Sequence, residues 1–478
     1  MKRRTKILAT LGPAVNSRER LLLLVKEGMD VARLNFSHGR YEDFARTISD
    51  LRSIEAEVGR PVGILADLQG PKIRVAKLPG GSMELAAGQE VWMIYDPPSL
   101  TKDGRAVIPV GYKEFVKDVA PGNTVLLDDG LMEMRAKDRD GDALLCEVIN
   151  GGLLKDNKGI NVPEASFSAP AITDKDYSDV LFCLEQGVDF IAMSFVRTAQ
   201  EVRHLKSFVE SRGKTSKIIA KIEKRDALVN LESIIEASDG ILVARGDLAV
   251  EVGNEKVPVL QKKMVRKCNL HGKTAIIATQ MLMSMVDNPR PSRAEASDVA
   301  NGVLDGADAV MLSNETAVGK YPMETVRMMN RIIEEAEEMP TEQPVLWNEW
   351  ELPPDGQMAI ALLQSAVRLG SILNAKLIAV LTQSGQSALL ISKCRSRTPV
   401  IALTSSQDTY RQLSIKWGVE ALFMEDMEDL VSQTVVFDAI GQKLRALKLC
   451  SVGDKIVVTA GLPRLAHGST NTIKIHQI

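Results

Sequence analysis

The sequence contains few cysteines, and no two of them are close enough along the chain to form a recognisable pair. There are 5 Cys in 478 residues, with no CxxC spacing. A disulfide framework and a zinc knuckle are therefore not indicated. Because unpaired cysteines suit a reducing compartment, we expect a cytoplasmic protein.

An excess of charge of either sign is also absent. Lys plus Arg number 59 and Asp plus Glu number 62, which gives a formal net charge of −3. Duplex binding needs a basic face that releases counterions, so we expect no nucleic-acid partner. The first apolar stretch ends at Gly12 and Pro13, too early for a signal sequence, and no later run is long enough to span a bilayer. We therefore expect no membrane partner.

Aromatic residues are scarce at 4% of the chain, whereas 45% of the residues are hydrophobic. The cores must therefore be built mainly from aliphatic side chains. At about 150 residues per domain, a chain of this length is expected to form about three domains.

The strongest pattern in the sequence is a short apolar run followed by an amphipathic, helical stretch. The runs occupy residues 6–10, 30–35, 62–67, 189–194, 217–223, 240–245, 274–279 and 308–313. Continuous apolar runs of this length are typical of strands buried on both faces of a parallel sheet. Eight such units predict an α/β fold of the (β/α)8 TIM barrel type. A doubly wound open sheet is the alternative that periodicity leaves open.

Two stretches interrupt this pattern and define further domains. Alternating runs separated by Gly, Asp and Asn follow the third strand, and a loop of that length would need a fold of its own. Several prolines follow Glu338, and a second, smaller strand and helix pattern comes after them. We predict a catalytic barrel in two parts, residues 1–71 and 168–340. A small β-barrel lid domain, residues 72–167, is inserted between them, and a C-terminal α/β regulatory domain covers residues 341–478.

Polar residues stand where the predicted strands end, which is where barrel enzymes place their chemistry. Glu223 and Asp247 offer carboxylates that suit Mg2+, which takes its remaining ligands from water and substrate. Arg33 and Lys221 add cations, and cations with a divalent metal are what phosphoryl transfer requires. One such residue alone is more often part of a structural salt bridge. Together they predict a Mg2+-dependent enzyme that acts on a phosphate or a carboxylate.

Longer motifs at these positions resemble the pyruvate kinase family over essentially the whole chain. They are RLNFSHG (33–39), DLQGPKIR (67–74), IAKIE (219–223), VARGDLAVEV (243–252), ATQM (278–281), NPRPSRAEASDV (288–299) and MLSNETAVGKYP (311–322). The resemblance implies transfer of the phosphoryl group of phosphoenolpyruvate to ADP, giving pyruvate and ATP. It also implies an Mg2+ or Mn2+ cofactor and a homotetramer.

The resemblance also implies roles for particular residues. Glu223 and Asp247 would hold the metal, and Lys221, Arg33 and Thr279 would be catalytic. The residues expected to contact the substrate are Arg33, Lys221, Gly246, Asp247 and Thr279. The residues expected to contact the nucleotide are Asn35, Phe36, Ser37, His38, Arg74 and Lys158.

One departure from the family pattern concerns potassium. Many members need K+ and carry DTKGPEIR, whereas residues 67–74 read DLQGPKIR, with Lys72 in place of Glu. The region concerned comprises Asn35, Ser37 and Asp67. An ammonium at Lys72 can supply the charge that K+ would otherwise place near Asp67, so we predict activity without K+. Alternatively, Lys72 merely lies on the hinge to the lid.

A hydroxyl-rich loop precedes a predicted helix in the C-terminal domain and is suited to a phosphate group. Its candidate effector residues are Thr382, Ser384, Gly385 and Ser387. The final loop, residues 461–471, lacks the Trp and the Gly-rich form of members that respond to fructose bisphosphate. We therefore expect activation by a sugar monophosphate or AMP. An ordinary strand-to-helix turn without a ligand is the alternative.

Two other functions remain open. The chain could be another Mg2+-dependent barrel enzyme that handles enolpyruvate or 2-oxo acids, or a non-catalytic paralogue that senses metabolites. The second alternative predicts loss of Lys221, Glu223 or Asp247, and all three are present.

Overall fold

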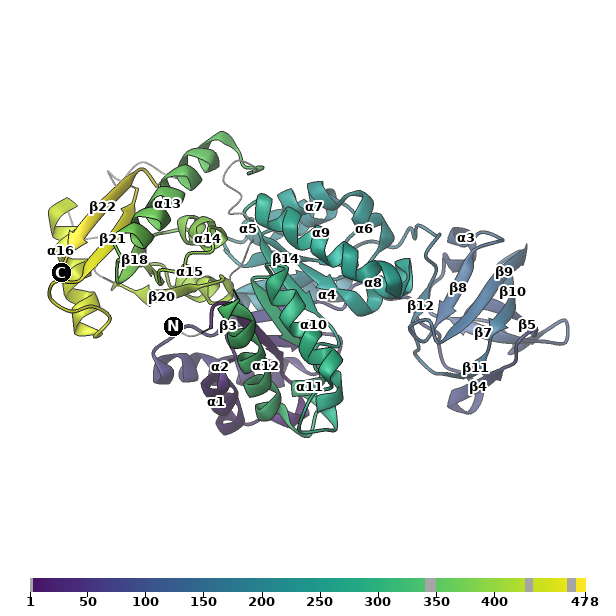
Figure 1. Cartoon of the computed structure of the whole chain (residues 1–478). Coiled ribbons are helices and arrows are strands. Elements are labelled where there is room, and N and C mark those ends of the chain that lie inside the picture. Colours follow the sequence, from purple (N-terminus) through teal and green to yellow (C-terminus); the bar gives the residue numbers. More distant parts are fainter. Residues whose placement is uncertain (1–2, 340–349, 426–432, 462–469) are drawn as a thin grey trace.

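The computed structural model describes residues 3–339, 350–425, 433–461 and 470–478. Three parts lie in a row, with the barrel in the middle, the inserted β domain at one end and the C-terminal domain at the other (Figure 1). Although the inserted domain lies at one end in space, its chain segment lies between β3 and β13 of the barrel.

Eight parallel strands form the closed barrel, in the order β1-β17-β16-β15-β14-β13-β3-β2. Their bounds are β1 (Lys6–Thr10), β2 (Val31–Asn35), β3 (Gly63–Asp67), β13 (Phe190–Met193), β14 (Lys217–Ile222), β15 (Gly240–Ala244), β16 (Thr274–Ala278) and β17 (Ala309–Leu312). All eight apolar runs are strands, as expected. Because β1 pairs with both β2 and β17, the sheet has no free edge, and the open-sheet alternative is wrong.

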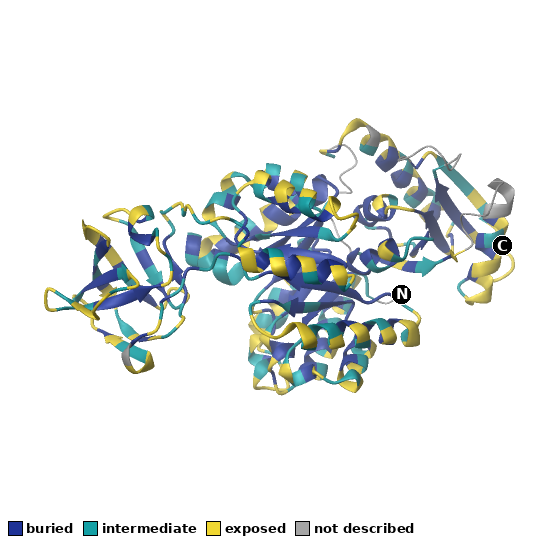
Figure 2. Cartoon of the chain, turned by 180° about the vertical axis from the view of Figure 1, so that it is seen from behind, coloured by how far each residue is buried: buried dark blue, intermediate teal, exposed yellow. Residues whose placement is uncertain are grey.

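Helices cover the outside of the barrel, and the strands beneath them are buried (Figure 2). The helices are α1 (Arg18–Glu27), α2 (Tyr41–Val58), α4 (Asp174–Glu185), α5 (Ala199–Glu210), α6 (Arg225–Val229), α7 (Leu231–Ala237), α8 (Arg245–Val252), α9 (Val257–Leu270), α10 (Arg293–Leu304), α11 (Asn314–Ala317) and α12 (Pro322–Glu338). Capping boxes at Thr173, Thr198 and Ser292 fix the starts of α4, α5 and α10. In the described part of the chain, no helix is long and apolar enough to cross a membrane.

The inserted domain is built of β-strands, which form a seven-stranded sheet and a separate two-stranded sheet. Its strands are β4 (Ser82–Leu85), β5 (Glu90–Tyr95), β6 (Thr101–Lys102), β7 (Arg105–Val110), β8 (Thr124–Leu127), β9 (Met132–Asp140), β10 (Ala143–Asn150), β11 (Gly152–Lys155) and β12 (Ile160–Asn161), with a short helix α3 (Phe115–Asp118). Residues 73–76 join the two sides of the main sheet: Val75 N–H donates to the Lys158 carbonyl (2.8 Å), and Gly111 N–H donates to the Arg74 carbonyl (2.9 Å). The sequence did not reveal β4, β6, β11 and β12, which are short and carry polar residues.

The C-terminal domain has a five-stranded sheet in the order β20-β19-β18-β21-β22. Its elements are α13 (Pro354–Ile372), β18 (Leu377–Leu381), α14 (Gln386–Lys393), β19 (Val400–Thr404), α15 (Gln407–Gln412), β20 (Val419–Phe423), α16 (Gln433–Ala446), β21 (Lys455–Ala460) and β22 (Thr472–Gln477). The predicted boundary at residues 340 and 341 lies outside the described residues, as do residues 462–469 of the final loop.

Candidate active site

A buried carboxylate connects three strand ends at the mouth of the barrel. Asp67 ends β3, and its Oδ2 accepts from Arg33 Nε of β2 at 2.8 Å. Its Oδ1 lies 3.1 Å from Lys221 Nζ of β14. Burial would raise the pKa of Asp67, but Lys221 and Arg33 outweigh that effect and hold the pKa below its usual value of 3.8. Asp67 therefore stays ionised and fixes both cations in place.

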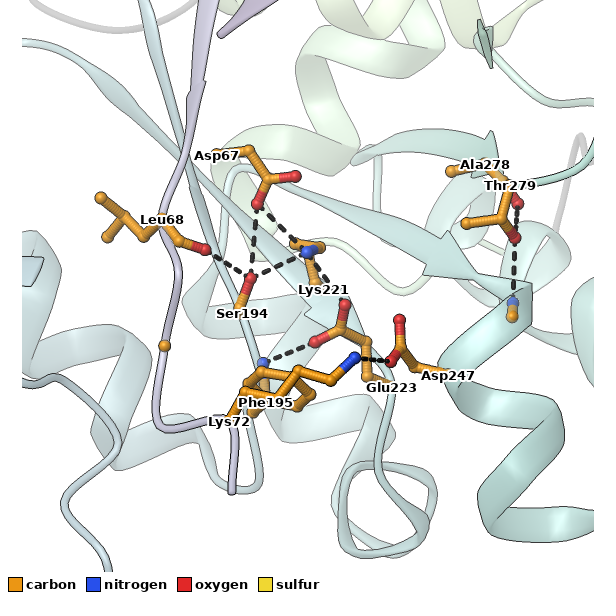
Figure 3. Close-up of polar contacts among 12 residues, drawn as sticks. Asp67, Leu68, Lys72, Ser194, Phe195, Lys221, Glu223, Asp247, Ala278 and Thr279 are labelled. Atoms are coloured by element: carbon orange, nitrogen blue, oxygen red, sulfur yellow. Dashed lines mark hydrogen bonds and ion pairs between the residues drawn. The ribbon is translucent and has the colours of Figure 1, made fainter. Parts of the chain in front are cut away.

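Lys221 lies among acceptors on three sides, as Figure 3 shows. Its Nζ donates to Ser194 Oγ at 2.8 Å and lies 2.9 Å from Glu223 Oε1. Burial alone would lower the pKa of Lys221, but the carboxylates of Asp67 and Glu223 outweigh it and raise the pKa above the ordinary value of 10.5. The side chain therefore carries a permanent positive charge.

Glu223 and Asp247 form a pair of carboxylates with unequal surroundings. Glu223 is buried, and its Oε2 accepts from the Phe195 N–H at 2.8 Å. Burial raises its pKa, Lys221 opposes this rise, and the negative charge of Asp247 adds to it. Two carboxylates that repel each other in this way are the donors that a divalent cation would satisfy. The donor set therefore fits Mg2+.

Thr279 has an unusual backbone conformation at the end of β16. Its φ is +72°, which is rare for a β-branched residue, and the next residue, Gln280, also has a positive φ of 53°. Thr279 Oγ1 accepts from the Gly246 N–H at 2.9 Å, and Arg245 donates to the Thr279 carbonyl at 2.7 Å. These contacts hold a strained conformation that turns the hydroxyl toward the first turn of α8.

A cleft of about 730 Å3 opens between the barrel and the inserted domain. The barrel side includes Gly246, Asp247 and Thr279, and the inserted domain contributes Asp129 and Gly130. Three of the residues that the sequence assigned to metal and substrate, Gly246, Asp247 and Thr279, thus border a space large enough for small phosphorylated molecules, whereas Arg33, Lys221 and Glu223 are not among its lining residues.

The position of Lys72 differs from the expected one. Its Nζ lies 3.2 Å from Asp247 Oδ1 and 3.8 Å from Asp129 Oδ1, whereas the ion-pair partners of Asp67 are Arg33 and Lys221. The chain leaves the barrel after β3, so the long side chain reaches across the mouth to α8. The Lys72 charge is therefore placed beside the carboxylate of Asp247 rather than beside that of Asp67.

The predicted nucleotide contacts lie in two groups. On the barrel side, Phe36 is buried and its ring stacks on Phe44 at 4.4 Å, so its side chain belongs to the core, whereas His38 is exposed. Asn35 Oδ1 accepts from the Ser37 N–H at 3.2 Å and shapes this loop.

The second group lies in the inserted domain. Arg74 donates to the Asn157 carbonyl at 2.9 Å, and Lys158 pairs with Asp128 at 2.8 Å. None of these contacts joins the two residues to the cluster around Lys221.

Sequence reasoning missed two members of this site. Ser194 ends the fourth apolar run, and its hydroxyl accepts from Lys221 and donates to the Leu68 carbonyl at 2.7 Å. Thr10 ends the first run, and its Oγ1 accepts from Arg33 Nη1 at 2.9 Å. The available signal was their place at a strand end, which is the signal that identified the other residues.

The predicted effector loop forms a compact turn before α14. Gly385 has a φ of +81°, and its N–H donates to Thr382 Oγ1 at 3.0 Å. Ser387 and Thr470 share a hydrogen bond between their hydroxyls at 2.6 Å. Ser384 is exposed.

Comparison with known proteins identifies the family. The family described as "Pyruvate kinase, barrel domain" matches residues 2–326, and "Pyruvate kinase, alpha/beta domain" matches residues 360–476. The chain belongs to the pyruvate kinase family. It is therefore an enzyme, a glycolytic kinase of the pyruvate kinase type.

Individual pyruvate kinases agree with this assignment. The pyruvate kinase of Geobacillus stearothermophilus is 42% identical over all of this chain and 81% of its own length. That of Mycobacterium intracellulare is also 42% identical, over 100% of this chain and 99% of its own length. A crystal structure of a pyruvate kinase from Cryptosporidium parvum superposes with a TM-score of 0.91 at 37% identity, covering 100% of this chain and 96% of that one.

Proposed function

We propose that this pyruvate kinase transfers the phosphoryl group of phosphoenolpyruvate to ADP, giving pyruvate and ATP. The position of the Lys221 ammonium, between Asp67 and Glu223 at the barrel mouth, is the observation that carries the proposal. A lactate dehydrogenase-coupled assay of the purified chain with phosphoenolpyruvate and ADP tests it directly. Absence of pyruvate formation would overturn it and favour the non-catalytic alternative.

Arg33 and Lys221 would bind the phosphoryl group. During transfer, the bond between the enol oxygen and phosphorus breaks and a bond forms to the terminal oxygen of ADP, so negative charge develops on the enol oxygen. A fixed, permanently charged ammonium stabilises that charge without having to reorganise. Asp67 and Ser194 support this role because both contact Lys221 Nζ, at 3.1 and 2.8 Å, and hold it in place.

Glu223 and Asp247 would hold Mg2+ or Mn2+, which when bound would neutralise the charge of substrate oxygens. The Gly246 N–H and Thr279 Oγ1 would contact the substrate at the same rim, where they already bond to each other. Thr279 would lie near the enolate carbon that finally receives a proton.

The inserted domain would act as a lid. Water in the site could accept the phosphoryl group in place of ADP, so closure over the cleft protects the reaction. Arg74 and Lys158 of the lid would contact the nucleotide from one side, and the loop Asn35 to His38 would contact it from the other. In the structure Lys158 pairs with Asp128, and this ion pair would have to open or be shared when the nucleotide binds.

The enzyme would also be active without K+. The Lys72 ammonium lies 3.2 Å from Asp247, which places a fixed monovalent charge at the edge of the proposed metal site. A bound K+ at the same place would be repelled by Lys72.

The activity would be regulated by an effector that binds the loop before α14 in the C-terminal domain. The turn at Gly385 and the start of α14 present Thr382, Ser384 and Ser387, which suit the phosphate of a sugar monophosphate or AMP. A titration of activity with these compounds at subsaturating phosphoenolpyruvate tests the assignment, and flat responses to all of them would remove it. The enzyme would also be a homotetramer and would lie in the cytoplasm. Five unpaired, buried cysteines support the cytoplasmic location.

A further inference from the structure

A cluster of one histidine and three carboxylates lies on the outside of the barrel, where the chain passes into the C-terminal domain. His271 follows the last residue of α9, just before β16 begins. Glu232 and Glu236 belong to α7, which packs beside α9 (Figure 1), and Glu351 belongs to the segment that leads into α13. Because β16 starts beside this cluster, the cluster lies at the end of the barrel opposite the proposed active site.

The imidazole of His271 is surrounded by hydrogen-bond acceptors, although its side chain is only 4% exposed. Nδ1 lies 3.0 Å from the Lys267 carbonyl and 3.1 Å from Glu351 Oε2, and Nε2 lies 4.0 Å from Glu236 Oε1. A neutral imidazole carries a single N–H. One ring nitrogen must therefore turn its lone pair toward an acceptor, which is unfavourable unless a cation lies between them. That cation is either a second proton on the ring or a metal ion.

The carboxylates are close enough to this ring to share a metal ion with it. One ligand atom from each of Glu232, His271 and Glu351 lies within 4.8 Å of the others. Ligand atoms about 2.0 to 2.1 Å from a tetrahedral Zn2+ are about 3.3 Å apart, so the gaps to be closed are roughly 1.5 Å at most. Both glutamates are exposed, and rotation of their side chains can close such gaps.

The charge of the cluster also favours a cation. Three carboxylates stand against one ammonium, that of Lys267, whose Nζ lies 2.8 Å from Glu232 Oε2. The hydrogen bond from Lys267 holds the pKa of Glu232 below its ordinary value of 4.5, so this carboxylate is ionised near neutral pH. With a neutral imidazole, the cluster has two more negative charges than positive ones. A divalent ion would balance them.

We propose that His271, Glu232 and Glu351 bind Zn2+, with Glu236 beside the ring. Imidazole together with carboxylates suits Zn2+ better than Mg2+, which prefers oxygen ligands alone. One ring nitrogen would bind the ion, and the other would donate its N–H to the neighbouring carbonyl or carboxylate, as in most metal-binding histidines. The Glu351 N–H already donates to the Leu270 carbonyl at 3.1 Å, so this segment rests on the end of α9. A bound ion would fasten the segment before α13 to the barrel.

The test measures Zn2+ binding by calorimetry in the full chain. An Asp247→Asn background with Mg2+ in excess keeps Zn2+ out of the proposed active site, and the five cysteines are buried. We expect one Zn2+ per chain, with affinity at least about tenfold weaker when His271→Ala is added. His204→Ala removes an exposed histidine of α5 and should leave the affinity unchanged. Lys267→Met removes the ammonium that competes for Glu232, so it should strengthen binding.

Absence of a Zn2+ site, or equal affinity with and without His271, would overturn the proposal and show that a second proton balances the ring. If His271→Ala does not fold, Glu351→Gln, at an exposed side chain, decides in the same way. Zn2+ should also raise the midpoint temperature of thermal unfolding, and less so in Glu351→Gln. Equal rises would show that the ion does not reach the segment before α13. None of these measurements depends on pyruvate formation, so failure of this proposal is distinguishable from failure of the proposed function.

Discussion

The Lys221 ammonium lies 2.9 Å from the carboxylate of Glu223, two residues further along the chain. Side chains two residues apart on a strand point to the same side, so this pair is set up by local geometry at the end of β14. One residue is the proposed phosphoryl-stabilising cation and the other a proposed metal ligand. Their contact places both charges at one point of the barrel mouth.

Replacing Lys221 with Met tests the role of this cation. We expect the turnover number for pyruvate formation to fall at least about 100-fold, since a fixed charge facing the developing oxyanion is lost. Circular dichroism should show an unchanged fold. Lys267→Met, which removes a lysine paired with Glu232 on the outside of the barrel, should leave turnover unchanged. Near-normal turnover of Lys221→Met would show that the assigned role is wrong.

The metal ligands can be tested by titration with Mg2+. Asp247→Asn and Glu223→Gln keep the size of each side chain but remove its charge, so the Mg2+ concentration for half-maximal activity should rise at least about tenfold. Direct binding of Mn2+, followed by electron paramagnetic resonance, should weaken in parallel. Asp298→Asn, at a carboxylate that pairs with Arg245 beside the cleft, serves as the control. Unchanged metal affinity in both variants would place the metal elsewhere.

The predicted independence of K+ rests on the charge of Lys72, although this charge lies beside Asp247 rather than beside Asp67. Replacing K+ by tetramethylammonium at equal ionic strength should change the wild-type rate less than about twofold. Lys72→Glu places a carboxylate beside Asp247 and Asp129, so its activity should fall without K+ and recover when K+ is added. Strong activation of the wild-type enzyme by K+ would instead favour a purely structural role of Lys72 at the hinge.

The hydroxyl of Thr279 can be separated from the shape of its side chain. Thr279→Val keeps the branched shape but removes the acceptor of the Gly246 N–H, so turnover should fall at least about tenfold. Thr279→Ser keeps the hydroxyl and should retain most of the activity. Steady-state kinetics of both variants distinguish the two contributions. Equal losses in the Ser and Val variants would show that the methyl group matters as much as the hydroxyl.

A buried ion pair links the C-terminal domain to the barrel. Lys393 at the end of α14 contacts Asp308, which precedes β17, and Arg395 lies 3.2 Å from the same carboxylate. Lys393→Met should lower the free energy of unfolding by about 3 kcal/mol, because it leaves Asp308 buried with fewer partners. Urea unfolding measures this loss of free energy. An unchanged urea midpoint would show that Arg395 alone is a sufficient partner for Asp308.

The same pair predicts a dependence of stability on pH. Burial would raise the pKa of Asp308, but Lys393 and Arg395 outweigh it and hold the pKa below 3.8. The group then stabilises the fold at pH values above 3.8, and this contribution is lost as the pH falls through the lower pKa of the folded state. The midpoint temperature of thermal unfolding should therefore fall less steeply between pH 5 and pH 3 in Asp308→Asn than in the wild type.

Much of the fold follows from the sequence because parallel strands in a barrel are buried on both faces. Each of them therefore appears as an apolar run, and the direction of the chain shows which end carries the chemistry. This is how Arg33, Lys221, Glu223 and Asp247 could be selected. The short strands β4, β6, β11 and β12 leave no such run, since each has only two to four residues and includes polar ones.

Only the tertiary structure decided which side chains meet. Lys72 and Asp247 are separated by 175 residues, and no local pattern shows that the lysine reaches this carboxylate rather than Asp67. Ser194 and Lys393 likewise gain their partners from another strand or from another domain. Burial and alternation are local properties that the sequence records. The pairing of charges depends on how distant elements pack, because an ion pair forms wherever folding brings opposite charges within a few ångströms.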